Sequence, residues 1–119
     1  MSVDISAVVG ITGKSDKSGP INQQFALTLS GLKVKREIEV IVLAADVDLA
    51  VLLPPLTTQA LLFVQSDLPC SFTKNAETVV HALSANGMYL EAGGVVATTL
   101  LFTGSGVPSS QVYIFIAGN

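Results

Sequence analysis

The chain has 119 residues, of which 50% are hydrophobic and 13% are charged, and its net charge is −3. This length fits one domain with a core of its own, and an acidic balance without a large basic cluster argues against nucleic acid as a partner. The first residues lack the pattern of a signal peptide, and no stretch has the roughly 20 apolar residues of a membrane-spanning helix, so we expect no membrane partner.

The first half of the chain predicts long strands. Asp4–Thr12 is a first strand, and Gly13–Pro20 is a polar loop with glycine and proline as turn residues. Phe25–Leu29 forms a second strand. Leu32–Ala44 alternates polar and apolar residues, which is typical of a half-buried antiparallel strand. Its last part, Val40–Leu43, is apolar at every position and predicts burial on both faces.

Short apolar segments follow in the middle of the chain. Leu49–Leu53, Leu61–Gln65 and Cys70–Thr73 predict strands that end at proline- or asparagine-containing turns.

The next region leaves two alternatives open. Thr78–Ala85 is compatible with a strand or extended loop, because of its β-branched residues, and with a short helix, because its apolar residues recur at helical spacing. Asn86-Gly87 favours a two-residue hairpin, and Gly93-Gly94 predicts a second hairpin that leads into the strand Val95–Thr103.

The last 28 residues carry no charged side chain. In the terminal strand, Gln111–Ala117, one row is Val112, Ile114 and Ile116, and the other includes Tyr113 and Phe115. One row must face the core, and the other needs a cover from the same subunit or from another chain. Strands at intervals of roughly 8 to 12 residues predict an all-β fold, an antiparallel β-sandwich of jelly-roll or Greek-key type, as a single domain over residues 1–119.

Residues that could support chemistry are few. A catalytic triad would need His81, the only histidine, with Cys70 or a serine as nucleophile, but no surrounding motif supports one. Asp46 and Asp48, with Asp67, could bind Ca²⁺ but lack the pattern of a known calcium loop. We therefore expect no catalytic residue, no metal site and no cofactor, and a protein that is not an enzyme.

Residues 61–119 contain, in order, the segments LLFVQSDLPCSFTKN, YLEAGG, VVATTLLFTG and QVYIFIAGN. With these segments, the second half of the chain resembles small structural proteins of tailed bacteriophages. An aromatic residue usual after the glycine turn is replaced here by Val95-Val96. The resemblance implies a β-sandwich that decorates or cements a capsid, or forms part of a tail or fibre. It also implies a protein without an active site that is typically an oligomer and often a trimer.

These observations together predict a non-enzymatic virion structural protein, made in the host cytoplasm, whose partners are further copies of itself and a major capsid protein. The alternative is a ligand-binding β-sandwich for carbohydrates, with Tyr89 or Tyr113 as the aromatic platform. Low charge and poorly guarded strand edges favour a subunit that hides surface in an oligomer, and the resemblance favours a trimer. The candidate interface residues are Leu52, Pro54, Pro55, Leu56, Val112, Tyr113, Ile114 and Phe115.

Overall fold

The computed structural model describes residues 3–15, 19–75, 77–95, 97–106 and 109–119. Every regular element in these segments is a β-strand, and none of them forms a helix that could span a membrane. In chain order the strands are β1 (Val3–Ser15), β2 (Gly19–Leu32), β3 (Val34–Leu43), β4 (Leu49–Leu52), β5 (Gln59–Ser66), β6 (Cys70–Lys74), β7 (His81–Leu83), β8 (Met88–Val95), β9 (Thr99–Gly104) and β10 (Ser109–Gly118).

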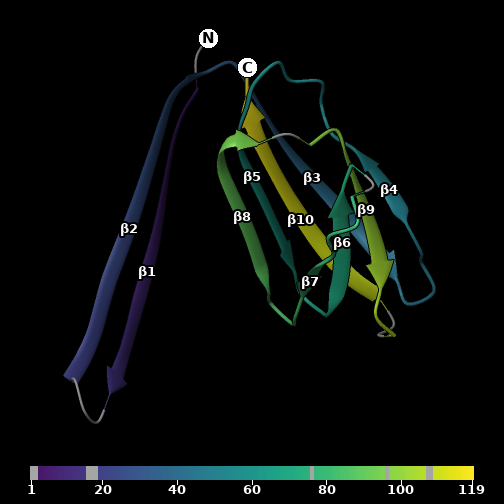
Figure 1. Cartoon of the computed structure of the whole chain (residues 1–119), viewed down its shortest axis with the longest axis horizontal. Helices are drawn as coiled ribbons and strands as arrows, with labels where there is room; N and C mark the ends of the chain where they lie inside the picture. The colour runs from purple at the N-terminus through teal and green to yellow at the C-terminus, as the bar shows by residue number, and fades with distance from the viewer. Residues whose placement is uncertain (1–2, 16–18, 76, 96, 107–108) are drawn as a thin grey trace.

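Strands β3 to β10 form two four-stranded antiparallel sheets that face each other (Figure 1). One sheet has the order β3-β10-β5-β8 and the other has the order β4-β9-β6-β7. The hydrogen-bonded neighbours include the nested pairs β3 with β10, β4 with β9, β5 with β8 and β6 with β7. This nesting arises when the whole segment from β3 to β10 folds as one long antiparallel hairpin and then wraps into two layers. Such an arrangement defines a jelly roll. The predicted all-β sandwich of jelly-roll type is therefore confirmed.

The core lies between the two sheets, and β10 crosses its centre. Because β10 pairs with β3 on one side and β5 on the other, its backbone is hydrogen-bonded on both edges. Its inner row, Val112, Ile114 and Ile116, is at most 2% exposed. In its outer row, Tyr113 and Phe115 are half-buried. The predicted division of the terminal strand into a core row and an outer row is confirmed.

Both predicted glycine hairpins are wrong, because the jelly-roll connections pass from one sheet to the other. Asn86-Gly87 joins β7 of one sheet to β8 of the other, so the flanking strands are not paired. Gly93-Gly94 lies inside β8, where the two glycines oppose the single residue Ala60 of β5 in a bulge. Within Thr78–Ala85, residues His81–Leu83 form a strand, which decides between the two alternatives for this segment.

The prediction that Val40–Leu43 is buried on both faces is also wrong. Ile41 is 58% exposed and Leu43 is 53% exposed. Both belong to β3, which is an edge strand, and their side of the sheet has no second layer of the sandwich over it. Burial on both faces needs a layer on both sides of the sheet, and the sandwich has only two layers.

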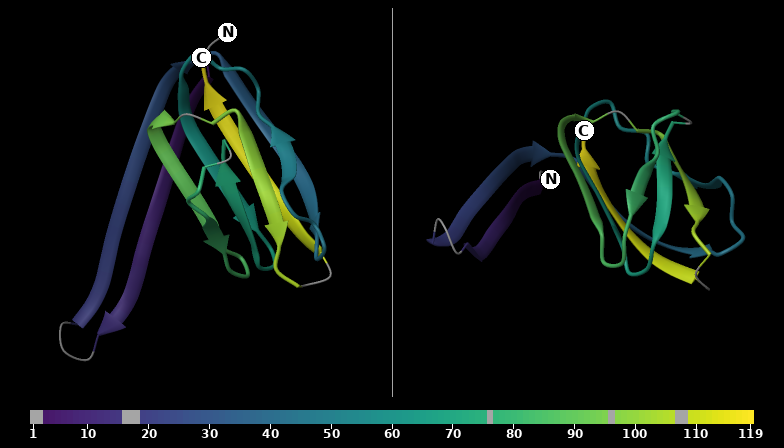
Figure 2. Two further views of the ribbon diagram at one scale, coloured as in Figure 1. Left: turned by 45° about the vertical axis from the view of Figure 1, so that its right-hand side comes forward. Right: turned by 60° about the horizontal axis from the view of Figure 1, so that its bottom comes forward.

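Strands β1 and β2 pair with each other as a long antiparallel hairpin, here called the arm (residues 3–15 and 19–32). The arm projects from the end of the sandwich where the chain's C-terminus lies, and the views in Figures 1 and 2 agree on this. The sandwich itself is made of residues 34–119. The strands extend into the predicted loop Gly13–Pro20, as far as Ser15 and from Gly19, and residues 16–18 lie outside the described part.

Hydrogen bonds order the base of the arm and the junction that follows it. Gly31, with a φ of 71°, lies in a bulge of β2 and donates its N–H to Asp4 Oδ1 at 3.1 Å. The left-handed φ suits glycine because other residues pay a steric cost there. Lys33 then donates its N–H toward the Gly118 carbonyl oxygen at 3.1 Å and the Asn119 Oδ1 at 2.9 Å.

Candidate functional site

The arm is an amphipathic ribbon. In the sequence, the odd-numbered positions of β1 from Val3 to Ile11 are all apolar, whereas the even-numbered ones are mostly polar. The register pairs Ile5 with Leu29, Ala7 with Leu27 and Val9 with Phe25. Paired residues share a face of an antiparallel ribbon, so the register unites the apolar positions of both strands.

The polar row of the arm is in solvent. Its described side chains are exposed, namely Asp4, Ser6, Val8, Gln24, Ala26 and Thr28. The sequence predicts the two strands but not their pairing or the shared apolar row. The period-two alternation in both strands indicates such a row, whereas the polar segment between them favours a longer loop.

The outer face of the sheet β3-β10-β5-β8 is a second apolar surface. The register aligns Phe115 with Phe63 and Leu90, and in the next row Tyr113 with Gln65 and Met88. We call these six residues the outer patch. Leu90 is 44% exposed and Met88 is 66% exposed, whereas the three aromatic residues are half-buried. The charged residues of this face, Lys35, Glu37 and Glu39, all lie on the edge strand β3.

The aromatic side chains of the outer patch pack against each other. The rings of Phe63 and Tyr113 meet edge to face with centroids 6.2 Å apart, which is a favourable aromatic geometry. Partial burial raises the pKa of the Tyr113 hydroxyl, and the neighbouring Glu37 and Glu39 carboxylates raise it further. The hydroxyl therefore stays protonated at neutral pH beside an acidic edge.

A groove of about 460 Å³ adjoins the outer patch. Tyr113 and Ile41 supply apolar surface there, and the other lining residues are largely polar. The polar residues that line it are Glu39, Gln65, Ser66, Asp67, Asn86 and Gln111. Asp67 is already used by the fold, because its Oδ1 accepts the Gln111 N–H at 2.7 Å. The groove thus combines one aromatic ring with amide and carboxylate groups.

The predicted interface residues fall into three environments. Val112 and Ile114 belong to the core, so they have no surface left to offer a partner, because β10 turns alternate residues inward. Tyr113 and Phe115 lie on the outer patch.

The remaining predicted interface residues belong to β4 and the segment after it. Leu52 is 76% exposed, Pro55 is exposed, and Pro54 and Leu56 are half-buried. Leu56 packs against the core. This segment lies in or next to the opposite sheet, so it does not continue the outer patch.

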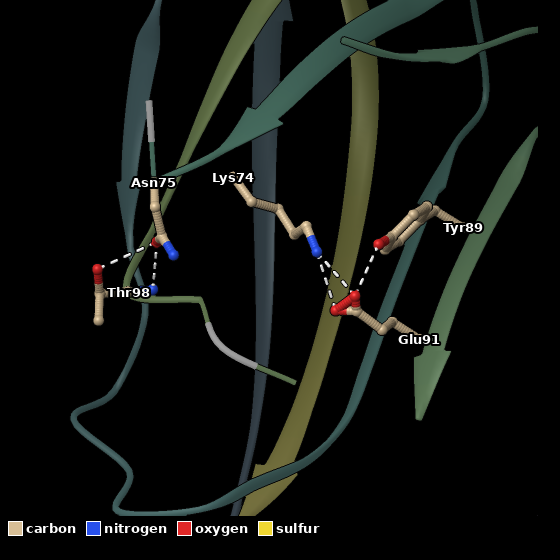
Figure 3. A network of polar contacts seen from close by, with 5 residues as sticks. All are labelled: Lys74, Asn75, Tyr89, Glu91 and Thr98. Atoms are coloured by element: carbon tan, nitrogen blue, oxygen red, sulfur yellow. Dashed lines mark hydrogen bonds and ion pairs between the residues drawn. The ribbon is translucent and has the colours of Figure 1, made fainter. Parts of the chain in front are cut away.

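A charged cluster lies between the two sheets, at the β6 and β8 strands (Figure 3). Lys74 Nζ is 2.9 Å from Glu91 Oε1 and 2.7 Å from Glu91 Oε2, with side chains 13% and 27% exposed. The Tyr89 hydroxyl donates to Glu91 Oε2 at 3.1 Å, and Lys74 Nζ lies 5.8 Å from the centre of the Tyr89 ring. Burial lowers the pKa of Lys74, but the hydrogen bonds with Glu91 and Tyr89 outweigh it and the net pKa is raised.

The same cluster predicts a loss of stability at alkaline pH. Burial raises the pKa of Tyr89, and the pKa of Lys74 is also raised, so the folded state holds both protons more tightly than the unfolded chain does. Their contribution is complete below the unfolded values of roughly 10 and is lost as pH rises through the higher folded values. We expect the melting temperature to fall more steeply above pH 10 in the native chain than in a Lys74→Met/Glu91→Leu variant. If the melting temperature falls equally steeply with pH in the two proteins, the prediction is contradicted.

The residues considered for catalysis are not assembled into a reactive group. Cys70 is 2% exposed and its thiol donates to Ser66 Oγ at 3.4 Å. Burial raises the pKa of this thiol, which disfavours the reactive thiolate. The His81 ring packs against Phe72 and Tyr89, with ring centroids 5.1 and 4.8 Å away, and these two rings also contact each other. Its Nε2 is buried and has no hydrogen-bond partner among the described residues.

Of the acidic residues considered for calcium, Asp46 and Asp67 have carboxylates that bind the backbone, whereas Asp48 is exposed. Asp46 Oδ2 accepts the Leu43 N–H at 2.7 Å and closes the turn after β3, while Asp67 binds the β10 backbone as described above. Across the described segments, no three histidine, cysteine or acidic side chains come close enough together to hold a metal ion.

Comparison of this chain with protein-family models, curated proteins and solved structures finds no match. What the protein does is therefore inferred from its own residues.

Proposed function

We propose that this protein is a non-enzymatic structural subunit that assembles with further copies of itself. The single observation that carries the proposal is the arm. A two-stranded hairpin is at best marginally stable in water unless its apolar row is covered. The arm projects from the sandwich as a ribbon of two long strands, so a neighbouring molecule is the natural cover.

The outer patch supports the same proposal. A soluble monomer rarely exposes a contiguous apolar surface unless the surface has a binding role. Here a group of aromatic and aliphatic side chains lies on a sheet face that carries charge along one edge strand. A subunit that both offers an arm and presents an apolar face has the parts needed for self-association.

Within this class, we propose a virion protein that decorates or cements a capsid, with a tail or fibre component as the second possibility. Jelly rolls are the fold of many viral capsid domains, but they also occur in lectins and cupins, so this support is an analogy of fold. The sequence resemblance to small bacteriophage structural proteins points the same way. A major capsid protein would then be the partner.

Light scattering of the full chain at micromolar concentration tests the assembly. We expect an oligomer, and we expect a chain that starts at Lys33 to give a folded monomer. Among the described side chains, the core cluster and the residues packed against it all come after the arm, from Ile38 and Val40 onward. A monomeric full-length protein would contradict the proposal.

A carbohydrate-binding function is the second candidate, and the groove beside Tyr113 favours it. Sugars are bound by an aromatic ring together with amide and carboxylate groups, and the groove offers both. If this function holds, Tyr113→Ala should abolish binding on a glycan array. Tyr89→Ala should preserve it, because Tyr89 packs against the core between the sheets. If glycan binding survives Tyr113→Ala, the groove is not the carbohydrate-binding site.

A further inference from the structure

We infer that the apolar row of the arm docks on the outer patch of a second copy of this chain. The inference rests on the proposed self-assembly and adds the two surfaces that meet. It starts from the fact that each subunit carries one amphipathic ribbon and one apolar sheet face.

The widths of the two surfaces match. Strands in a sheet lie about 4.8 Å apart, so the two-stranded arm is about 10 Å wide, and the outer faces of β10, β5 and β8, which carry no charged residue, together span about 14 Å. The arm therefore fits on the patch without covering the charged residues of β3.

The area also suffices. The end of β10 at Ala117 and Gly118 is already buried, so eight residues remain and a docked ribbon is about 26 Å long and 10 Å wide, which buries about 520 Å² from both surfaces. If each subunit gives one arm and receives one, the two contacts bury about 1,040 Å², just above the roughly 1,000 Å² that a biological interface needs.

The arm begins at one end of the outer face and points away from it, so it leaves the outer patch of its own subunit free for a neighbour. Leu61 and Ala117 oppose each other on the outer face, next to the Lys33–Gly118 hydrogen bond, and both are buried although neither belongs to the core between the sheets. The last arm residue, Leu32, is buried as well. This end of the face is therefore already buried where the arm begins, and from there the arm leads away (Figure 2).

Charge does not oppose the contact. The described strands of the arm contain only Asp4 and Lys14 as charged residues, and the outer patch contains none. Docking therefore removes apolar surface from water without burying an unpaired charge, which is the favourable case for association.

Cross-linking between two distinguishable full-length chains tests the inference. A tagged chain carries Ala7→Cys in the apolar row of the arm, and an untagged chain carries Leu90→Cys in the outer patch. After mixing, a short bismaleimide should link tagged to untagged chains. Cys70 is buried and serves as an unreactive internal control. Leu52→Cys, exposed on the opposite sheet, replaces Leu90→Cys in the control mixture and should give no link.

Four results are distinguishable. A link from Ala7→Cys to Leu90→Cys between chains supports the inference. An oligomer that links only to Leu52→Cys, or not at all, overturns the docking but keeps the self-assembly. A further chain carries both Ala7→Cys and Leu90→Cys. If a link forms only within this chain, the arm covers its own sheet, which also overturns the docking. A protein that is monomeric throughout removes both the inference and the proposed function.

A pair of neighbouring substitutions gives an independent readout. Leu27→Asp puts a carboxylate in the apolar row, whereas Thr28→Asp puts it in the exposed polar row. Burying an unpaired charge is costly, so Leu27→Asp should raise the dissociation constant of the oligomer roughly a hundredfold, with Thr28→Asp close to the native value. Equal effects of both changes would contradict docking through the apolar row.

Discussion

Replacing Phe115 with lysine is expected to give a folded monomer, whereas replacing its neighbour Ile114 with lysine should give an unfolded chain. Phe115 lies on the outer patch, opposite Glu37 in the register, so a lysine there reaches solvent and an acidic partner. In the monomer this change should cost less than about 1 kcal/mol. In the oligomer it would place a charge in the apolar contact.

The Ile114 change has a different consequence, because Ile114 is 0% exposed. It removes about 2 to 3 kcal/mol of apolar burial and adds an unpaired charge in the core, at a further cost of several kcal/mol. The sum approaches the whole stability of a domain, about 5 to 15 kcal/mol. Circular dichroism measures the fold and light scattering the mass. Unfolding of both variants would show that Phe115 is covered within its own subunit, and a Phe115→Lys oligomer would exclude the outer patch as the interface.

Replacing Lys74 with methionine should destabilise the subunit by about 2 to 3 kcal/mol, somewhat below the usual range for a fully buried pair. Glu91 would keep the Tyr89 hydroxyl as a donor but lose the ammonium group that faces both of its carboxylate oxygens. At this chain length the loss corresponds to a fall in melting temperature of roughly 10 °C.

The double variant Lys74→Met/Glu91→Leu separates charge from packing. Replacing a buried ion pair with apolar residues of similar size is often neutral, so the double variant should recover most of the lost stability. Lys35→Met, at an exposed position of β3, is the matched control and should melt like the native protein. If the double variant is no more stable than Lys74→Met alone, then the cost comes from lost packing and not from the unpaired Glu91.

Local sequence patterns predicted many strands correctly but were misleading about turns. Strands such as Gln111–Ala117 were predicted because alternating side chains need a sheet with two different faces, and this follows from period two alone. Asn86-Gly87 is a strong local hairpin signal, yet here it joins strands of different sheets. A jelly roll pairs strands that are distant in the sequence, and two adjacent residues carry no information about that pairing.

The candidate site depends still more on long-range pairing. Phe63, Leu90 and Phe115 form one row only because β10 lies beside β5 and β5 beside β8. Likewise, Lys74 and Glu91 form an ion pair across the two layers, and nothing near either residue in the sequence predicts it. Their sequence separation of 17 residues includes a change of sheet.

The sequence by itself determined an all-β sandwich, a terminal strand with a core row and an outer row, and a low charge content. These properties depend on composition and on the two-residue period of a strand, which are local. The tertiary structure alone decided that β1 and β2 leave the sandwich as an arm, that Val112 and Ile114 are core residues, and that the outer patch is one continuous surface. Each of these depends on which strands become neighbours, and that choice is made by burying apolar faces across the whole chain.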